Sequence, residues 1–334
     1  MKEIGSEYEY GSFKVGKNEY IDLVDCPKRY VLSGRTGLYL VANEIKREKI
    51  DSIALPSYCC FSMIKPFLDL NFKIEFYDKY FLPSTKAILI MDYFGFLSND
   101  TITFAKKCSK NNKIIIVDAT QTAFSRSIIY NYANYIIVSY RKWFDCLCSV
   151  VYSNSGFKSK EPSKKYDDFE KNWRKASKLK KQYLNNSSIS KDTFLDLYAL
   201  ANTQLKENYK NYKASIEEIE KLKKIDTNYI RNKRRKNAEI LIKGLKKHKI
   251  LMFDKLGEND CPLFVPILLE KSKKDKIRDE LIKNNIYCPC HWPIESKMLQ
   301  KKTKYHDEEL SLICDQRYNE KDMNRILKII EKNL

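Results

Sequence analysis

Ile114-Ile115-Ile116-Val117-Asp118-Ala119-Thr120-Gln121 is the stretch that decides the fold. Four β-branched residues in a row predict a strand buried on both faces, and the carboxylate of Asp118 comes directly after it. A second apolar run over 135–138 is followed in the same way by Ser139-Tyr140-Arg141-Lys142. Polar side chains therefore follow two predicted strands at their carboxyl ends, which is where open α/β sheets build their sites.

Other short apolar runs alternate with helical stretches on either side of this segment. The predicted strands are 53–55, 73–77, 87–91, 114–117, 135–138 and 149–152, and helices are expected at 38–48 and 101–110. Strands that alternate with helices predict a mostly parallel sheet covered by helices on both faces. Over 164–224 the strand signal stops and apolar residues recur at helical spacing, which predicts long helices with one face packed in the core or against a subunit.

After residue 231 helices and strands alternate again, with strands expected at 263–269 and 286–288. We therefore expect an N-terminal arm over 1–29 and a large α/β domain over 30–230 that includes the helical segment 164–224. A small C-terminal α/β domain is expected over 231–334. A chain of 334 residues with 43% hydrophobic residues is long enough to bury a large core in this arrangement.

Composition excludes several classes of protein. No window approaches the roughly 18 to 20 apolar residues of a membrane helix, and the acidic, polar N-terminus does not resemble a signal peptide. We expect a cytoplasmic protein with no membrane partner. The ten cysteines lie mostly in apolar runs, so we expect reduced core residues. The one-residue gaps in Cys146/Cys148 and Cys288/Cys290 differ from the usual zinc spacing, so no metal is expected.

The chain is strongly basic, with a formal net charge of +19 from 62 Lys and Arg against 43 Asp and Glu. Such a surface attracts phosphates of any kind, including those of a nucleotide-linked substrate. The lysines fall mainly in Lys-rich tracts of apparent helices and are not interleaved with aromatic residues, so we interpret them as a solvated face. No nucleic-acid partner is expected.

Ser33-Gly34-Arg35-Thr36 follows a strand and opens a helix. A glycine turn before a helix points free backbone N–H groups and the helix dipole at one spot, where a phosphate fits. Taken alone, the tetrapeptide is better explained by Ser33 capping the helix, because Ser is a favoured cap residue.

Three more side chains complete a pattern typical of a cofactor site, and they belong to Asp118, Gln121 and Lys142. A carboxylate at the end of a buried strand needs a cationic partner, either a protonated pyridine nitrogen or an Arg or Lys in a structural ion pair. Gln121 has the reach to donate to a ring oxygen. An amine at Lys142, beside Arg141, has a lowered pKa and forms a Schiff base more readily. Together with the anion-binding turn, these groups are what holding pyridoxal phosphate requires.

These motifs carry a resemblance over nearly the whole chain. The matching segments are Ile4-Gly5-Ser6-Glu7, Ser33-Gly34-Arg35-Thr36, Leu55-Pro56-Ser57-Tyr58, 117–121, 139–143, 287–293 and Cys314-Asp315-Gln316-Arg317-Tyr318. The chain resembles the DegT/DnrJ/StrS family of pyridoxal-phosphate-dependent sugar aminotransferases. The resemblance implies the fold type I architecture of aspartate aminotransferase.

The resemblance also implies roles for single residues. Lys142 is expected to be the Schiff-base lysine, Asp118 to pair with the pyridine nitrogen and Gln121 to contact the ring oxygen. The residues expected to bind the phosphate are Gly34, Arg35, Thr36 and Ser139. Those expected near the substrates are Tyr58, Arg141, His291 and Arg317.

Two departures mark a divergent branch. Family members carry an aromatic residue that stacks on the cofactor ring, and here that place falls on Cys60, with Phe61 one step later. The glycine-rich segment after the lysine is replaced by Phe144-Asp145-Cys146-Leu147-Cys148-Ser149. We therefore do not carry over the identity of the sugar.

The resemblance implies a homodimeric transaminase that moves an amino group from glutamate to a keto sugar linked to a nucleotide, for polysaccharide or glycoconjugate synthesis. Two alternatives stay open. One is a pyridoxal-dependent dehydratase or decarboxylase, although the related sugar dehydratases replace the lysine that is present here. The other is a catalytically silent homologue that serves as a binding or scaffold subunit.

Overall fold

A seven-stranded sheet forms the centre of the larger part of the molecule in the computed structural model, which describes residues 2–21, 24–78, 80–185, 189–292, 294 and 302–334. The strand order is β2-β8-β7-β6-β5-β3-β4. β4, β3, β5, β6 and β7 are parallel, whereas β8 runs antiparallel to β7 and β2 antiparallel to β8. The strands are β2 (Lys28–Val31), β3 (Ser52–Pro56), β4 (Lys73–Tyr77), β5 (Ala87–Ile90), β6 (Ile114–Asp118), β7 (Tyr135–Ser139) and β8 (Ser149–Ser153).

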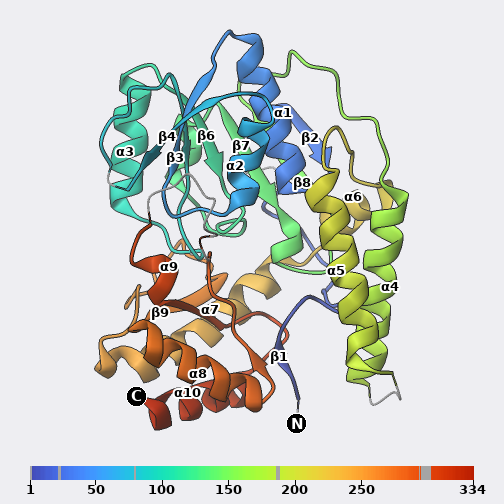
Figure 1. Cartoon of the computed structure of the whole chain (residues 1–334), viewed down its shortest axis with the longest axis vertical. Helices are drawn as coiled ribbons and strands as arrows, with labels where there is room; N and C mark the ends of the chain where they lie inside the picture. The colour runs from blue at the N-terminus through green and yellow to red at the C-terminus, as the bar shows by residue number, and fades with distance from the viewer. Residues whose placement is uncertain (1, 22–23, 79, 186–188, 293, 295–301) are drawn as a thin grey trace.

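Helices cover both faces of this sheet, as the alternation of the sequence predicts (Figure 1). Successive side chains of a strand point to opposite faces. On β7, Ile137 packs in the core shared with α1 (Gly34–Arg47) and α2 (Phe61–Leu68). Ile136 and Val138 pack in the other core, with α3 (Asn99–Lys110) and the 3₁₀ turn η1 (Ile128–Tyr132). The mostly parallel α/β sheet expected from the sequence is confirmed.

Two long helices, α4 (Asp167–Leu184) and α5 (Lys191–Glu207), form a hairpin beside the sheet. Trp173 of α4 and Tyr198 of α5 pack edge to face at 4.8 Å between ring centroids. In Figure 1 the pair extends from the level of the sheet to the level of the C-terminal helices. The shorter α6 (Ile216–Lys223) follows, so the predicted helical segment is present as three helices.

The C-terminal unit is built on α7 (Thr227–Leu245), which continues into the turn η3 (Lys246–His248). Its two-stranded sheet pairs β9 (Phe264–Leu268) with β11 (Glu309–Ile313) in antiparallel register. Helices α8 (Lys271–Lys283) and α10 (Glu320–Asn333) pack on this unit, and the short α9 (Tyr305–Glu308) precedes β11. The order helix, strand, helix agrees with the small α/β unit expected there.

The N-terminal arm joins the two units. β1 (Ile4–Gly5) pairs in parallel with β10 (Ile286–Tyr287) of the C-terminal unit, and Tyr10 N then donates to the Ser177 carbonyl on α4. The predicted arm extends to residue 29, but β2 already begins at Lys28, because Lys28 and Arg29 pair with the edge of β8.

Helix α2 and strand β11 have no counterpart among the predicted elements. Within the described residues, no helix is both long enough and apolar enough to cross a membrane. All ten cysteines are free thiols, and the described residues contain no cluster of three metal-ligating side chains.

The loop after β5 holds the C-terminal unit against the sheet. Leu263 N donates to the Phe94 carbonyl at 2.7 Å, and Cys261 N donates to the Gly95 carbonyl at 3.1 Å. Gly95 has φ of +89°, and a Cβ added there would lie 2.0 Å from the Cys261 carbonyl oxygen. Only glycine allows this close approach of the two backbones.

We expect Gly95→Ala to lower the free energy of unfolding by about 2 to 5 kcal/mol, because it adds an overlap with backbone to the strain of a positive φ. Gly156 is a matched control, since it has φ of +78° and nothing within 4 Å of an added Cβ. Gly156→Ala should cost only about 1 to 2 kcal/mol. Urea unfolding of the two variants measures the difference, and equal losses would contradict the role given to Gly95.

Candidate active site

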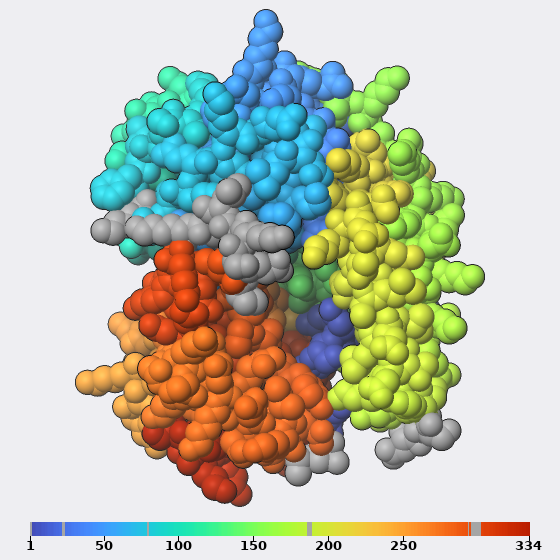
Figure 2. All heavy atoms as spheres, in the orientation of Figure 1, coloured from blue at the N-terminus to red at the C-terminus, as the bar shows by residue number. Residues whose placement is uncertain are grey.

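A cavity of about 730 Å³ lies between the carboxyl ends of β6 and β7, the start of α1, helix α5 and the C-terminal unit. Its volume is within the range of sites for small molecules and cofactors. Figure 2 shows the recess on the molecular surface, bordered by α5 and the C-terminal unit, with part of the N-terminal arm inside it. Three units of the chain therefore contribute walls to one site.

The position of Lys142 at the cavity is fixed by the hydrogen bonds of the next residue, Trp143. Lys142 ends the 3₁₀ turn η2 (Tyr140–Lys142), and Trp143 is fully buried. The Trp143 indole donates to the Thr120 carbonyl at 2.8 Å, and its own carbonyl accepts from the Gln316 side chain at 2.7 Å. The turn cannot rotate without breaking these bonds, so the lysine side chain is directed into the recess.

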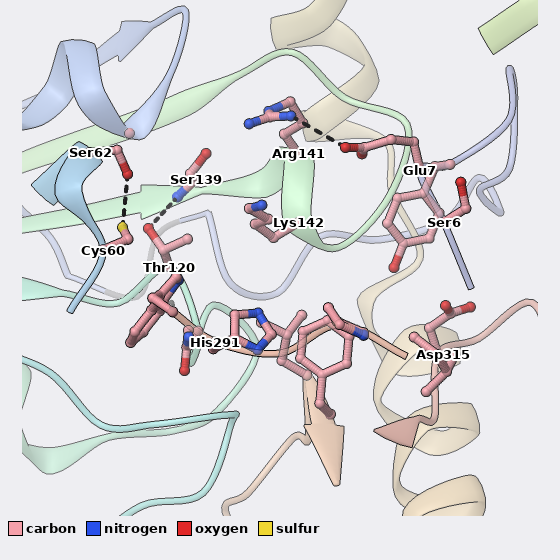
Figure 3. Close-up of a pocket in the computed structure, with 18 of the residues that line it drawn as sticks. Ser6, Glu7, Cys60, Ser62, Thr120, Ser139, Arg141, Lys142, His291 and Asp315 are labelled. Carbon is pink, nitrogen blue, oxygen red and sulfur yellow. Dashed lines mark hydrogen bonds and ion pairs between the residues drawn. The ribbon is translucent and has the colours of Figure 1, made fainter. Parts of the chain in front are cut away.

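The Lys142 amine has no hydrogen bond or ion pair with any residue that the structure describes, and its side chain is open to the cavity (Figure 3). Desolvation by the surrounding protein lowers the pKa of Lys142, the Arg141 guanidinium lowers it further, and Glu7 opposes the change. A lowered pKa increases the fraction of free amine at neutral pH, and the free amine is the nucleophile.

Asp118 ends β6 and is nearly fully buried. Its Oδ1 accepts from Thr120 N at 2.9 Å, and it has no ion pair within the described part of the chain. Burial raises the pKa of Asp118, and the hydrogen bonds from Thr120 oppose this rise. A buried carboxylate with no cation is costly, so a cation brought into the cavity would be bound strongly here.

Gln121 follows Asp118 on the same loop and also lines the cavity. Its Oε1 accepts from Phe94 N at 2.6 Å. With the oxygen engaged in this bond, the amide presents its nitrogen, a donor, to the cavity.

The start of α1 makes a polar cradle next to β7. Ser33 caps the helix, because its Oγ accepts from Thr36 N at 3.2 Å and lies 2.9 Å from the Thr36 hydroxyl. A Cβ on Gly34 would lie 3.2 Å from Ser139 Cβ and 3.8 Å from Thr120 Oγ1. The glycine therefore leaves room beside two hydroxyls, where the first N–H groups of a helix have no partner inside the helix.

Of the four residues expected to bind the phosphate, three line the cavity and one does not. Gly34, Arg35 and Ser139 line the cavity, whereas Thr36 is fully buried in the cap and does not. Arg35 Nη1 donates to the Leu205 carbonyl at 2.9 Å, while its Nε is buried with no hydrogen-bond partner among the described residues. Burial lowers the pKa of Arg35.

Cys60 lines the cavity and Phe61 does not. Cys60 precedes α2, and its Sγ lies 2.8 Å from Ser62 Oγ. Burial raises the pKa of this thiol, and the hydrogen bond from Ser62 opposes the rise. Phe61 begins α2 with 36% of its surface exposed.

The expected substrate residues fall into two groups. Arg141 and His291 line the cavity, and Nδ1 of His291 lies 2.9 Å from Ser311 Oγ. Tyr58 does not line it, because it is buried in an aromatic cluster with its hydroxyl donating to the His291 carbonyl at 2.5 Å. Arg317 lines it but is engaged, with bonds of 3.0 and 2.9 Å to the Asp315 carboxylate.

Several lining residues were not found from the sequence. Thr120 lies between Asp118 and Gln121 in the sequence, so its place beside two expected site residues could have indicated that it lines the site. Glu7 lies in the matching segment Ile4-Gly5-Ser6-Glu7, but the resemblance gave it no role. Arg278 of α8 has no local signal, because only the tertiary fold brings it to the cavity.

The fold is that of pyridoxal-phosphate-dependent sugar aminotransferases, which confirms the resemblance at the level of the fold. The structure superposes on PseC of Helicobacter pylori, an aminotransferase in pseudaminic acid biosynthesis, with a TM-score of 0.65 and 12% identity, covering 99% of this chain and 98% of that chain. NtdA of Bacillus subtilis, solved with bound cofactor PMP, gives a TM-score of 0.60 at 14% identity over 92% and 73% of the two chains.

A DegT/DnrJ/EryC1/StrS aminotransferase of Brucella abortus gives a TM-score of 0.60 at 13% identity, over 96% of this chain and 91% of that chain. The sequence itself matches no protein-family model and no curated protein. Similarity at this level of identity establishes the architecture, and the chemistry has to be argued from the residues of this chain.

We expect Lys142 to be labelled by acetic anhydride with a half-maximal pH below the reference lysine pKa of about 10.4, because desolvation and Arg141 both lower its pKa. Lys283 is the internal control, since its bond to Glu280 raises its pKa. Competitive labelling followed by peptide mass spectrometry gives both titration curves. A Lys142 midpoint at or above that of Lys283 would contradict the electrostatics described.

Proposed function

We propose that this protein is a pyridoxal-phosphate-dependent aminotransferase that transfers an amino group from glutamate to a nucleotide-linked keto sugar. The observation that carries the proposal is that one cavity holds the amine of Lys142 and the buried carboxylate of Asp118, neither of which has an ion pair among the residues that the structure describes. The start of α1 supplies a third feature, an anion cradle, to the same cavity. The fold shared with sugar aminotransferases supports the assignment.

The residues present fit pyridoxal phosphate. The Gly34 and Arg35 N–H groups and the Ser139 hydroxyl would hold the phosphate, with Thr120 adding a second hydroxyl in place of the expected Thr36. Asp118 would hold the protonated pyridine nitrogen, a cation that suits its buried carboxylate. Gln121 would donate to the ring oxygen, and Cys60 would contact the ring where relatives carry an aromatic residue.

When bound, the cofactor supplies an electron sink that lets a C–H bond next to the donor nitrogen break. Lys142 would supply the base, because its free amine would take the proton from the donor α-carbon and, once protonated, would act as the general acid. Asp118 would favour the protonated ring nitrogen by pairing its carboxylate with it. The locked position of Trp143 holds Lys142 in place for both proton transfers.

For Tyr58 and Arg317 we propose supporting roles in place of direct substrate contact. Tyr58 holds the His291 backbone through its hydroxyl, and Arg317 fastens the arm to Asp315. His291 remains the proposed contact for the sugar. Arg278 has no ion pair or hydrogen bond within the described residues and lines the same cavity, so it is available for an anionic group of the acceptor.

The altered segment after Lys142, which motivated the silent-homologue alternative, lies outside the cavity. Its residues 144–149 are buried, and none of them lines the cavity. Leu147 N donates to the buried Glu218 carboxylate at 2.6 Å, so the change from the glycine-rich pattern is accommodated in the core. The segment also supports the turn that carries Lys142, because Tyr140 N donates to the Cys148 carbonyl at 3.1 Å.

We expect the purified protein to show a visible absorption band with pyridoxal phosphate that is absent in Lys142→Ala and is bleached by glutamate. Asp118→Asn should keep the band but slow the bleaching by about 10² to 10⁴-fold, because a neutral amide does not hold the ring proton. Stopped-flow absorbance measures both. No band in the wild type would contradict the enzyme and favour the scaffold alternative.

We also propose a homodimer, as the resemblance implies. Leu195 and Leu200 of α5 are 38% and 48% exposed, and Leu195 lines the cavity, so apolar surface continues from the site onto α5. The holoprotein should sediment with twice the mass of the 39.5 kDa chain. A monomer that binds the cofactor at full occupancy would contradict this arrangement.

A further inference from the structure

Arg141 is a cation of the cavity whose hydrogen-bond donors are not engaged. Its guanidinium lies over the Trp173 ring, 4.7 Å from the ring centroid. It donates no hydrogen bond to any described residue. Its ion pair is with Glu7, where Nη1 and Oε1 lie 3.9 Å apart, beyond hydrogen-bond distance. The two side chains face each other across the site, with Lys142 nearby (Figure 3).

Glu7 reaches this position from an arm that is anchored through its backbone. The Glu7 carbonyl accepts from Arg317 Nη1 at 3.2 Å and from the Lys180 ammonium. The carboxylate itself is 35% exposed and has no hydrogen bond within the described residues. The backbone is therefore held from two directions, while the side chain is free to leave Arg141 without unfolding the arm.

We propose that Arg141 binds the α-carboxylate of the amino donor and that Glu7 is an internal carboxylate which occupies this place until the donor arrives. This rests on the proposed function. A guanidinium offers two parallel N–H donors, which a carboxylate accepts in bidentate geometry. The pair with Glu7 does not use this geometry at 3.9 Å, whereas an incoming ligand is free to adopt it.

The position next to Lys142 supports a carboxylate of the donor in particular. In an α-amino acid the carboxylate and the amine share one carbon, so a cation adjacent to the reactive lysine holds the reacting carbon beside it. Among the described residues, three other arginines line the cavity, and one of them, Arg278, comes from α8 of the C-terminal unit and not from the turn that carries Lys142. Arg317 is engaged with Asp315, and Arg35 donates to the Leu205 carbonyl.

Glu7 therefore sets the affinity of the site for carboxylates. The apparent dissociation constant rises with the fraction of molecules in which Glu7 occupies Arg141, because a ligand binds only the remainder. Removing the Glu7 charge should tighten binding, and removing the Arg141 charge should weaken it. An ordinary structural ion pair would not give these opposite effects.

Binding of glutarate to the cofactor-loaded protein, measured by titration calorimetry, tests the proposal, since glutarate lacks the amine and cannot react. Glu7→Gln should lower the dissociation constant about twofold to fivefold, as expected for a partly exposed ion pair. Arg141→Gln should raise it by at least about tenfold, the effect of losing hydrogen bonds to a charged group. Arg141→Lys, which keeps the charge without the planar donors, should fall between.

Glu9→Gln is the matched control. Glu9 lies two residues further along the same arm and pairs with Arg317 at 3.2 Å, so its removal changes the net charge equally without touching Arg141. Glutarate affinity that is unchanged or weaker in Glu7→Gln, or tightened equally in Glu9→Gln, would overturn the proposal. So would a tightening by Glu7→Gln that persists in the Arg141→Gln background, because the effect must act through Arg141.

Two further measurements distinguish the proposed roles of Arg141 and Glu7 from the proposed aminotransferase function. If Arg141 instead held the cofactor phosphate, Arg141→Gln would weaken pyridoxal phosphate binding and leave glutarate affinity unchanged, which would also overturn the proposal. A wild type that is bleached by glutamate, together with a Glu7→Gln variant of unchanged glutarate affinity, would overturn this proposal and leave the proposed function standing. If no cofactor is bound, glutarate titration of the same variants tests the carboxylate site alone.

Discussion

The parallel pairing of β6 with β7 is the constraint on which the rest of the structure depends. Asp118 stands opposite Ile137 in this register, and Ala119 N donates to the Ile137 carbonyl at 2.8 Å. Both strands therefore end at the same edge, with Lys142 only a short turn beyond β7. A slip of one residue would turn Asp118 to the opposite face of the sheet and separate the carboxylate from the amine.

A second set of contacts makes the lysine depend on both units of the chain. Gln316 of the C-terminal unit donates to the Trp143 carbonyl, and its own oxygen accepts from Arg234 at 2.8 Å. Arg234 also donates to the Tyr8 hydroxyl of the arm at 2.6 Å. These groups are buried and polar, so losing one leaves its partner unsatisfied at a cost of about 1 to 3 kcal/mol. The arm, the sheet and the C-terminal unit are thereby held around one turn of chain.

Much of the fold followed from the sequence because its signals are local. The strand before Asp118 and the strand before Lys142 are continuous apolar runs, and the structure places both strands within one residue of the expected ends. Strand β11 was missed because two of its polar residues, Glu309 and Ser311, are fully buried, whereas a sequence pattern assigns polar residues to an exposed face. Both contact His291 in the interior. The contact of Glu7 with Arg141 joins residues far apart in sequence, so no local pattern encodes it.

The electrostatics of the site explain why Asp118 and Lys142 suit a ligand that carries both a positive and a negative charge. In the protein as described, burial raises the pKa of Asp118 and lowers that of Lys142, so each shift opposes the charged form. A raised carboxyl pKa costs stability above the unfolded value, and a lowered lysine pKa costs stability below its own unfolded value. Near neutral pH both costs apply together. A ligand that pairs with the carboxylate and takes up the free amine relieves both, so its binding is coupled to the stability of the fold. The two groups whose charged forms the protein alone disfavours therefore favour the binding of such a ligand.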